Sequence, residues 1–315
     1  MTDTKTLPDE LARVVAEAFG GATCSDVETL GGGLSGAATY GVTIAGTRYV
    51  VRRGSGVDAK AIRCLKMASE RGVAPKLRHA DIATGATILE RIDGAPVRPG
   101  SARPGSIAAT ATALRRLHDG PSFPRSVDLD EVLGNVVGAI RSKGHAGLPP
   151  DLLAALAETT GLTRAVAVRA PCHNDLNPGN MVERDGRVYF LDWDTAANND
   201  PYFDLGEVCV FGLQARGDRG IFLAEYLGRA PTEREAAHAT IAWIMALGFY
   251  SAAFFMVSAL TGSFSLEATA LPMLELLAGM GRGAAPPPTV AASLFAAMRE
   301  QMAGAEYDAA KRVLT

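Results

Sequence analysis

The spacing of hydrophobic and polar residues changes after residue 92 of the chain. Before that point, short β-branched and aromatic runs such as "TYGVTI" (39–44) and "TRYVVRR" (47–53) are separated by glycine-containing turns. Runs of this kind, whose side chains alternate between two faces, predict an antiparallel sheet. Further strands are expected at 27–30, 76–80 and 86–92, and helices at 8–20 and 58–71.

From residue 107 onward, the hydrophobic residues mostly recur at helical spacing. The preceding stretch "RIDGAPVRPGSARPGS" (91–106) is rich in glycine and proline and is expected to be a linker. We predict helices at 107–119, 128–142, 150–160, 205–227, 232–260, 266–280 and 287–313, interrupted by a hairpin region at 165–194. The pattern therefore predicts an α+β fold with two lobes, a small antiparallel β-rich lobe at 1–93 and a larger helical lobe at 94–315.

One apolar segment raises the question of a membrane span. The stretch from Thr240 to Leu266 carries no charged residue and is long enough to cross a bilayer. No lysine or arginine follows until Arg282, however, and the aromatic residues lie in the middle rather than at the ends. We expect a buried helix of the larger lobe, and a membrane-attached protein is the alternative.

Composition narrows the class of protein further. The 315 residues are 48% hydrophobic and carry a formal net charge of -3, which is typical of a globular protein and offers no basic surface for nucleic acid. The four cysteines are far apart and the N-terminus is polar and acidic, so a disulfide framework and a secretory signal are not expected. A cytoplasmic protein without nucleic-acid or membrane partners fits best.

Polar residues gather in "CHNDLNPGNMVERDGRVYFLDWD" (172–194). The dipeptide Asp185-Gly186 is a strong signal for a two-residue hairpin turn, which places Asn180 opposite Leu191 and therefore within about one rung of Asp192. A bulged turn would shift this register by one residue but would keep Asn180 and Asp192 close together. An amide oxygen beside a carboxylate is a ligand set suited to Mg²⁺. The spacing predicts a magnesium site at Asn180 and Asp192.

Asp175 precedes Asn180 by five positions in the same loop. The pattern H-x-D-x-x-x-x-N, followed by a hairpin and an aspartate, is the arrangement of the catalytic loop and metal-binding aspartate of protein kinases. At average residue usage this spacing arises by chance in on the order of one such chain in a hundred. The alternative, that these residues are only turn formers, explains Asn177 and Asp185 well. It explains the remaining polar residues poorly.

The segments "CHNDLNPGN", "FLDWD" and "NDPYFDLG" resemble the aminoglycoside phosphotransferase and choline/ethanolamine kinase family, which has a two-lobed, protein-kinase-like fold. "LGGGLSGAATYGV", "YVVRR", "GVAPKL", "ILERIDG" and "LRRLHDG" follow the order that this family shows. The resemblance implies that Asp175 is the catalytic base, that Asn180 and Asp192 bind Mg²⁺, and that His173 braces the loop. It also implies a structural role for Asp204. "HND" is similar to the choline/ethanolamine branch.

The same resemblance implies a nucleotide site in the first lobe. "LGGGLSGA" (30–37), with Gly32, Gly33 and Ser35, would cover the phosphates of ATP, because glycine lets backbone N–H groups approach closely. Arg52 stands where protein kinases carry a lysine, and it can bind phosphate bidentately. Arg53 is an adjacent alternative.

The segment "ILERIDG" (88–94) would be the hinge, where backbone groups from Glu90 to Ile92 meet adenine. The family usually has a glutamate in the helix after the cation, but the expected position is near Ala61. Asp58 is a possible substitute, or the ion pair is absent. A missing pair motivates an alternative interpretation, a nucleotide-binding regulator with impaired catalysis.

The acceptor site is the least defined part of the sequence. A quaternary ammonium such as choline requires aromatic faces. The candidates are Trp193, Tyr202, Phe203, Trp243, Tyr250, Phe254 and Phe255, of which most are expected to be core residues. We select Trp193, Trp243 and Tyr250 as substrate residues, and we expect Asp194 or Glu207 to pair with a substrate ammonium or to act as structural carboxylates.

These observations predict an ATP- and Mg²⁺-dependent kinase that transfers the γ-phosphoryl group to the hydroxyl of a small molecule. An amino alcohol such as choline or ethanolamine is the expected acceptor. An aminoglycoside or another sugar-like alcohol is the alternative.

Overall fold

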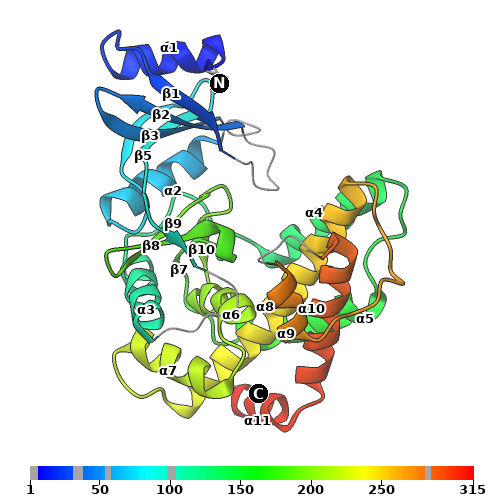
Figure 1. The fold of residues 1–315 in the computed structure, drawn as a ribbon. Coiled ribbons are helices and arrows are strands. Elements are labelled where there is room, and N and C mark those ends of the chain that lie inside the picture. Colours follow the sequence, from blue (N-terminus) through cyan, green and yellow to red (C-terminus); the bar gives the residue numbers. More distant parts are fainter. Residues whose placement is uncertain (1–5, 31–37, 54–57, 98–103, 281–284) are drawn as a thin grey trace.

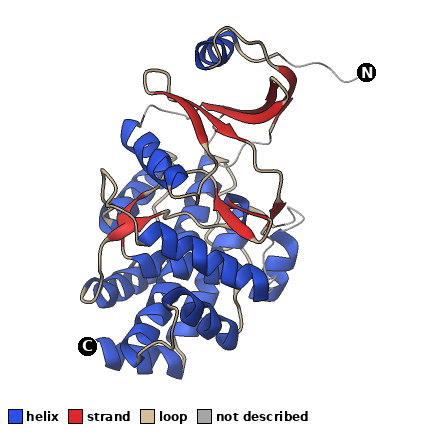
Figure 2. Ribbon diagram, turned by 90° about the vertical axis from the view of Figure 1, so that its left-hand side faces the viewer, coloured by secondary structure: helices blue, strands red, loops and turns tan. Residues whose placement is uncertain are grey.

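The two-lobed α+β fold expected from the sequence is confirmed by the arrangement of helices and strands (Figure 1). The computed structural model describes residues 6–30, 38–53, 58–97, 104–280 and 285–315. The strands of the first lobe gather at one end of the molecule, and helices make up most of the other end (Figure 2).

The first lobe contains a five-stranded antiparallel sheet in the order β1-β2-β3-β5-β4. Its strands are β1 (Ser25–Thr29), β2 (Ala38–Ile44), β3 (Thr47–Arg53), β4 (Leu77–Asp81) and β5 (Ala86–Glu90). In β3, Tyr49 and Val51 are buried, and Arg52 lies on the opposite face because side chains alternate along a strand. This alternation directs Arg52 away from the hydrophobic core of the lobe.

Two helices cover the two faces of this sheet. Helix α1 (Asp9–Ala18) buries Leu11, Val14 and Val15 in the small core that contains Val51. Helix α2 (Ala59–Glu70) instead contributes its buried side chains to the large core of the second lobe. Helix α2 therefore belongs structurally to both lobes.

The chain leaves the sheet after Glu90 and joins the second lobe as a short strand, β6 (Ala95–Pro96). Strand β6 pairs with β8 (Met181–Arg184), which forms a hairpin with β9 (Arg187–Phe190). A separate pair is formed by β7 (Ala170–Cys172) and β10 (Ala197–Asn199). The polar segment 172–194 therefore contains the β8–β9 hairpin and lies in the chain between the paired strands β7 and β10.

Helices form the rest of the second lobe. They are α3 (Pro104–His118), α4 (Leu129–Ser142), α5 (Pro150–Arg164), α6 (Pro201–Gly212), α7 (Arg216–Leu227), α8 (Glu233–Leu260), α9 (Met273–Met280), α10 (Pro287–Met302) and α11 (Ala305–Leu314). The single helices predicted at 205–227 and 287–313 are wrong, because the backbone leaves the helical region at Leu213 and at Gly304. The helix predicted from residue 266 begins only at Met273.

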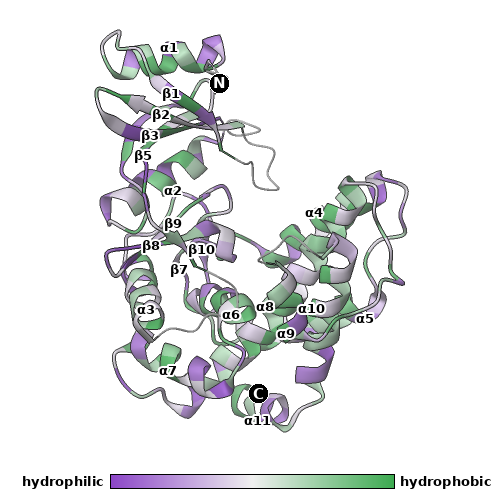
Figure 3. Ribbon diagram, viewed as in Figure 1, coloured by the Kyte–Doolittle hydropathy of each residue, from purple (hydrophilic) through white to green (hydrophobic). Residues whose placement is uncertain are grey.

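Helix α8 is the apolar segment that is long enough to span a membrane. In the fold it is the central helix of the second lobe, with most of its apolar stretch buried against α6 and α10 (Figures 1 and 3). Gly206 of α6 allows a close approach, because a Cβ at this position would lie 2.6 Å from the carbonyl oxygen of Ala242. The expectation of a buried helix therefore agrees with its packing.

A capping box fixes the start of α8. The Thr232 hydroxyl accepts from the backbone N–H of Glu235, and the Glu235 carboxylate accepts from the backbone N–H of Thr232. Hydrogen bonding from Arg229, together with the bond from Thr232, lowers the pKa of Glu235 to about 2. The stabilisation is therefore present above the ordinary glutamate pKa and is lost as the pH falls towards 2.

We expect Glu235→Gln to lower the free energy of unfolding by about 0.5–1 kcal/mol at neutral pH, because the side chain is only partly shielded from solvent. The difference from the wild type should shrink as the pH falls below about 4, where the wild-type carboxylate begins to be protonated. Urea unfolding at several pH values measures this. Glu233→Gln is a matched control, because Glu233 is exposed in the same helical turn. Glutamine can also form a capping box, so an equal pH dependence in both variants would contradict a contribution from the Glu235 charge.

Candidate active site

The loop that begins at His173 is held by a buried carboxylate on α6. Asp204 is fully buried, and its two oxygens accept from the backbone N–H groups of His173 (2.8 Å) and Asn174 (2.9 Å). The Nε2 atom of His118 lies 3.1 Å from the same carboxylate. Asn174 has a φ of 64°, in the left-handed region that asparagine tolerates, and the bond to Asp204 holds it there. Asp204 thus has the structural position that the resemblance implied.

His173 joins this loop to the segment that follows β9. Its Nε2 donates to the carbonyl oxygen of Leu191 at 2.8 Å, and its ring packs edge-on against Trp193 with centroids 4.7 Å apart. The side chain is fully buried. A buried imidazole with these contacts can brace two loops but cannot reach a substrate.

Asp175 is half-buried and is oriented by three side chains. Its Oδ1 accepts from Asn177 Nδ2 at 3.0 Å and from the Tyr250 hydroxyl at 3.4 Å, and its Oδ2 accepts from Asn180 Nδ2 at 2.9 Å. Asn180 Nδ2 also donates to the Asp175 carbonyl oxygen. The amide N–H groups of Asn180 are therefore directed at Asp175, which leaves its amide oxygen as a ligand for a cation.

The hairpin between Asn180 and Asp192 has the predicted register. Arg184 pairs with Arg187 across the Asp185-Gly186 turn, and the Leu191 N–H donates to the Asn180 carbonyl oxygen at 2.8 Å. Both turn residues have positive φ, as a type I′ turn requires. The turn signal was therefore sufficient to predict which residues lie opposite one another.

Negative charge concentrates around Asp192. Burial raises the pKa of this carboxyl, the Arg52 guanidinium opposes that effect, and the charges of Asp194 and Asp175 raise it further. The Asp192 backbone has a φ of 58°, a conformation that is uncommon for a residue with a side chain. A half-buried group of carboxylates on a strained backbone is suited to binding a cation.

Arg52 supplies a cation at this position. Its Nη1 and Nη2 donate to the two oxygens of Asp194 at 2.8 and 2.7 Å, and Nη2 also donates to Asp192 Oδ1 at 2.7 Å. Burial acts to lower the pKa of Arg52, but hydrogen bonding to Asp194 and the charges of both aspartates raise it overall. The structure thus brings Arg52 of the first lobe together with Asp192 of the second.

The sequence left Asp58 as one candidate for the ion-pair partner of Arg52. The structure shows that Asp58 has other partners. Its Oδ1 accepts from the backbone N–H groups of Lys60 and Ala61 at the start of α2, and its Oδ2 forms an ion pair with Arg125. Arg125 lies in the connection between α3 and α4, where no sequence motif singles it out. Sequence reasoning missed this arginine.

Two of the four substrate residues proposed from the sequence, Trp193 and Trp243, are buried in the core of the second lobe. Trp193 is buried against His173, and its Nε1 donates to the Phe190 carbonyl oxygen. Trp243 is buried under Arg219, whose guanidinium lies 3.7 Å from the ring centroid. Their burial makes both tryptophans core residues rather than walls of an acceptor site.

Of the other two proposed substrate residues, Tyr250 is buried but contacts Asp175 directly. Asp194 is half-exposed, and its carboxylate is already bound by Arg52. Glu207 is buried, and its Oε2 accepts from the Leu176 N–H at 3.0 Å. Glu207 is therefore a structural carboxyl group beneath the loop and not a partner for a substrate ammonium.

Glu207 provides a test through its titration. Complete burial raises the pKa of Glu207 well above its usual value, and the charges of Asp204 and Asp175 raise it further. A carboxyl group with a raised pKa in the folded state makes the protein less stable as the pH rises above the ordinary value, because the unfolded chain ionises first. The protein therefore loses stability above pH about 4.3 through this group.

We expect Glu207→Gln to become progressively more stable relative to the wild type between pH 5 and pH 8. The change should exceed the few tenths of a kcal/mol expected of Glu225→Gln, a control at an exposed position of α7. Guanidinium unfolding of the three proteins across this pH range measures the difference. A constant gap between Glu207→Gln and the wild type would show that Glu207 is ionised in the folded protein.

Of the remaining residues predicted for nucleotide binding, only Glu90 and Ile92 lie in the described part of the chain. Gly32, Gly33 and Ser35 lie outside the described residues. Glu90 is the last residue of β5, and its backbone N–H donates to the Lys76 carbonyl oxygen. Ile92 follows in the extended connection to β6. Contacts of these residues with adenine stay a prediction.

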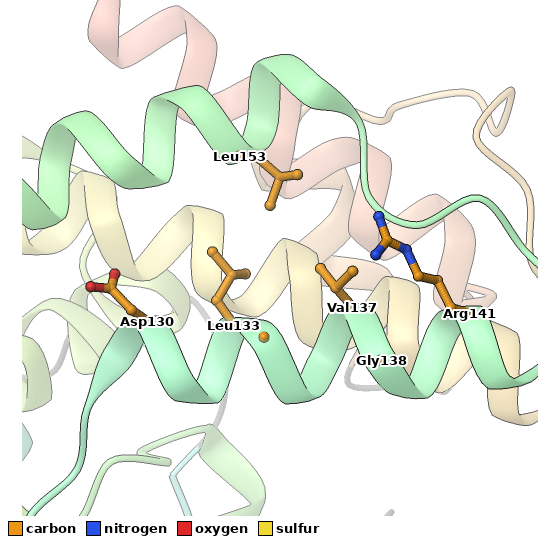
Figure 4. A pocket seen from close by; sticks show the side chains of 7 residues that line it. Asp130, Leu133, Val137, Gly138, Arg141 and Leu153 are labelled. Carbon is orange, nitrogen blue, oxygen red and sulfur yellow. The ribbon is translucent and has the colours of Figure 1, made fainter.

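A surface hollow of about 380 Å³ lies between α4 and α5. Leu133, Val137 and Leu153 form its apolar floor, with Asp130 and Arg141 at its two ends (Figure 4). None of the residues predicted for catalysis or nucleotide binding lines this hollow. It is therefore separate from the candidate active site.

The sequence model of the phosphotransferase enzyme family, APH, matches residues 26–241, a range that covers the sheet, the 173–180 loop and the hairpin. The chain belongs to this family. The resemblance inferred from the motifs is confirmed. Over 72 residues it is 50% identical to Protein LicA of Haemophilus influenzae, a match that covers 22% of this chain and 27% of that relative. The match thus covers little more than a quarter of that relative.

Solved structures share the fold of this chain at low sequence identity. A choline/ethanolamine kinase family protein from Mesorhizobium loti superposes with a TM-score of 0.69 at 22% identity, covering 92% of each chain. The choline kinase LicA from Streptococcus pneumoniae gives a TM-score of 0.65 at 17% identity, covering 94% of this chain and 99% of the other. These likenesses support the fold over nearly the whole length of the chain.

Proposed function

We propose that the protein is an ATP-dependent kinase that transfers the γ-phosphoryl group to the hydroxyl of a small alcohol. One observation carries the proposal: the half-buried Asp175 carboxylate is fixed by Asn177, Asn180 and Tyr250 beside the cation-binding carboxylate Asp192. Phosphoryl transfer depends mainly on positioning and on charge stabilisation, and this group of residues offers both. Membership of a phosphotransferase family supports the same reaction.

In this proposal Asp175 orients the acceptor hydroxyl and accepts its proton as the new P–O bond forms and the bond to ADP breaks. The amide oxygen of Asn180 and the carboxylate of Asp192 have the oxygen chemistry that Mg²⁺ prefers, and they would hold the ion. When bound, Mg²⁺ neutralises charge on the β- and γ-phosphates. The Arg52 guanidinium would donate N–H groups to phosphate from one edge, while its other edge stays hydrogen-bonded to the Asp194 carboxylate.

An amino alcohol, such as choline or ethanolamine, is the proposed acceptor. Tyr250 on α8 contacts Asp175, and Phe254 lies one helical turn further along the same face and is only partly buried. Phe254 can therefore offer a ring face to a cationic head group whose hydroxyl reaches Asp175. The choline and choline/ethanolamine kinases that share the fold support this acceptor class.

The proposed reaction is tested by ATP consumption with a panel of acceptors: choline, ethanolamine, thiamine, aminoglycosides and sugar alcohols. Turnover that depends on choline or ethanolamine and on Mg²⁺ would support the proposal. Turnover with an aminoglycoside alone would show that the proposed acceptor class is wrong and that the proposed reaction, phosphoryl transfer to an alcohol, is right. Binding of nucleotide with Mg²⁺ but no turnover with any acceptor would instead favour a regulator with impaired catalysis.

Phe254→Leu tests the proposed aromatic contact, because leucine keeps the apolar bulk and removes the ring. We expect the KM for choline to rise roughly 2- to 30-fold, the range that a cation–π contact can contribute. The KM for 3,3-dimethylbutanol, the neutral analogue of choline, should change much less. An equal rise for both acceptors would assign Phe254 a purely apolar role.

We also propose that the protein acts in the cytoplasm. Its four cysteines are free, and three of them are buried, as expected in a reducing compartment.

A further inference from the structure

Arg125 lies in the connection between α3 and α4, on a backbone segment that is fixed against β10. The Arg125 carbonyl oxygen accepts from the backbone N–H of Asn198 at 2.9 Å and from its side-chain amide at 3.0 Å. The same amide group bonds to the backbone N–H and C=O of Phe123 at 2.7 and 2.8 Å. The position of Arg125 is therefore set by the second lobe.

The guanidinium of Arg125 binds three groups at once. Its Nε donates to the Ala196 carbonyl oxygen, its Nη2 donates to the Asp194 carbonyl oxygen, and its Nη1 forms an ion pair with Asp58. The side chain is only 20% exposed. A planar guanidinium can hold this fork geometry, whereas a lysine ammonium cannot reproduce it.

Each of these partners belongs to an element near the proposed nucleotide and metal site. Asp194 binds Arg52 through its carboxylate, so the carbonyl bond from Arg125 fixes the residue that anchors Arg52. Asp58 caps α2 with its other oxygen, at 2.8 Å from the Lys60 nitrogen. Arg125 therefore connects the start of α2 with the loop that follows Asp192.

Protein kinases couple the corresponding helix to the active site through an ion pair between a strand lysine and a helix glutamate. In this chain the matching helix position is the buried Ala61, and Arg52 pairs with Asp192 and Asp194 instead. Helix α2 is instead connected to the loop after Asp192 by the ion pair of Asp58 with Arg125 and by the bond from Arg125 to the Asp194 carbonyl oxygen.

We infer that Arg125 is a positioning residue of the nucleotide and metal site, which couples α2 to the loop carrying Asp192 and Asp194. The inference rests on the proposed function. Asp192 has a backbone in the left-handed region, and the carbonyl bonds from Arg125 hold the chain immediately after it. Loss of the guanidinium releases this loop and thereby the anchor of Arg52.

The test measures the affinity for a non-hydrolysable ATP analogue with Mg²⁺ by isothermal titration calorimetry. We expect Arg125→Ala to weaken binding roughly 10- to 100-fold, as is usual when residues that orient metal ligands are removed. Arg125→Lys should recover only part of this loss, because it restores the charge facing Asp58 but not both carbonyl bonds. Arg164→Ala is the control, since it removes an exposed ion pair with Asp130.

Asp58→Asn separates the ion pair from the helix cap. Asparagine caps a helix about as well as aspartate but cannot pair with a guanidinium, so a weaker affinity with an unchanged Tm would assign the effect to coupling. Hydrogen exchange should rise in residues 192–196 in Arg125→Ala and at the start of α2 in both variants. If Arg125→Ala does not fold, Arg125→Lys and Asp58→Asn decide the outcome.

Two negative results have different meanings. Wild-type protein that does not bind the analogue with Mg²⁺ would overturn the proposed function and this inference together. Wild-type binding with unchanged affinity in the Arg125 and Asp58 variants would overturn the inference alone.

Discussion

Asp175→Asn is expected to lower the rate of phosphoryl transfer by about 10²- to 10⁴-fold, the usual contribution of a positioned general base. The asparagine keeps the size of the side chain and can still bond to Tyr250 and Asn177, but it cannot accept the proton of the acceptor hydroxyl. Binding of a non-hydrolysable ATP analogue with Mg²⁺ should be almost unchanged, because Asp175 is not one of the proposed metal ligands.

Steady-state kinetics and calorimetry on the same preparation separate these two effects. Asp185→Asn is a suitable control, because Asp185 is exposed at the tip of the neighbouring hairpin and asparagine tolerates its positive φ. Activity close to that of the wild type in Asp175→Asn would remove Asp175 from the catalytic role. Loss of nucleotide binding in this variant would instead point to a metal ligand.

The largest effect on stability is expected for Asp204→Ala, which should lower the free energy of unfolding by roughly 3–5 kcal/mol. Removing the carboxylate leaves the buried N–H groups of His173 and Asn174 without an acceptor, together with the ring nitrogen of His118. Asp204 is fully buried, so bulk solvent does not reach these groups in the folded protein. Catalysis should fall as well, since the same bonds position the loop that carries Asp175.

Urea unfolding monitored by circular dichroism measures this change. Asp308→Ala on the exposed face of α11 should change stability by no more than about 0.5 kcal/mol, as is usual for surface positions. A loss below about 1 kcal/mol in Asp204→Ala would mean that the loop finds other acceptors and that its conformation does not depend on α6.

Local signals predicted the hairpin most completely. Asp185 and Gly186 both have positive φ angles, which define a type I′ turn. This turn sets the strand register that places Asn180 opposite Leu191. The alternation of Tyr49, Val51 and Arg52 was also readable, because side chains of a strand must alternate.

Features that depend on distant segments were not readable from the sequence. Strands β6, β7 and β10 have only two or three residues each and exist through pairing with distant partners. Tryptophan is a residue type that aromatic binding sites use, but the packing of the second lobe buries both Trp193 and Trp243. Arg125 was missed because its partners, Asp58 and Asp194, are far from it in the chain.

The proposed base and the proposed acceptor wall are supported by different helices, which has a consequence for how the protein can diversify. Asp204 and Glu207, on α6, hold the backbone around Asp175 from beneath, whereas the surface beyond Tyr250 belongs to α8. Under the proposed function, replacements at Phe254 and further along α8 should therefore alter which alcohol is accepted, while the backbone around Asp175 stays in place. Directed evolution towards new acceptors should concentrate on that stretch of α8 and leave α6 intact.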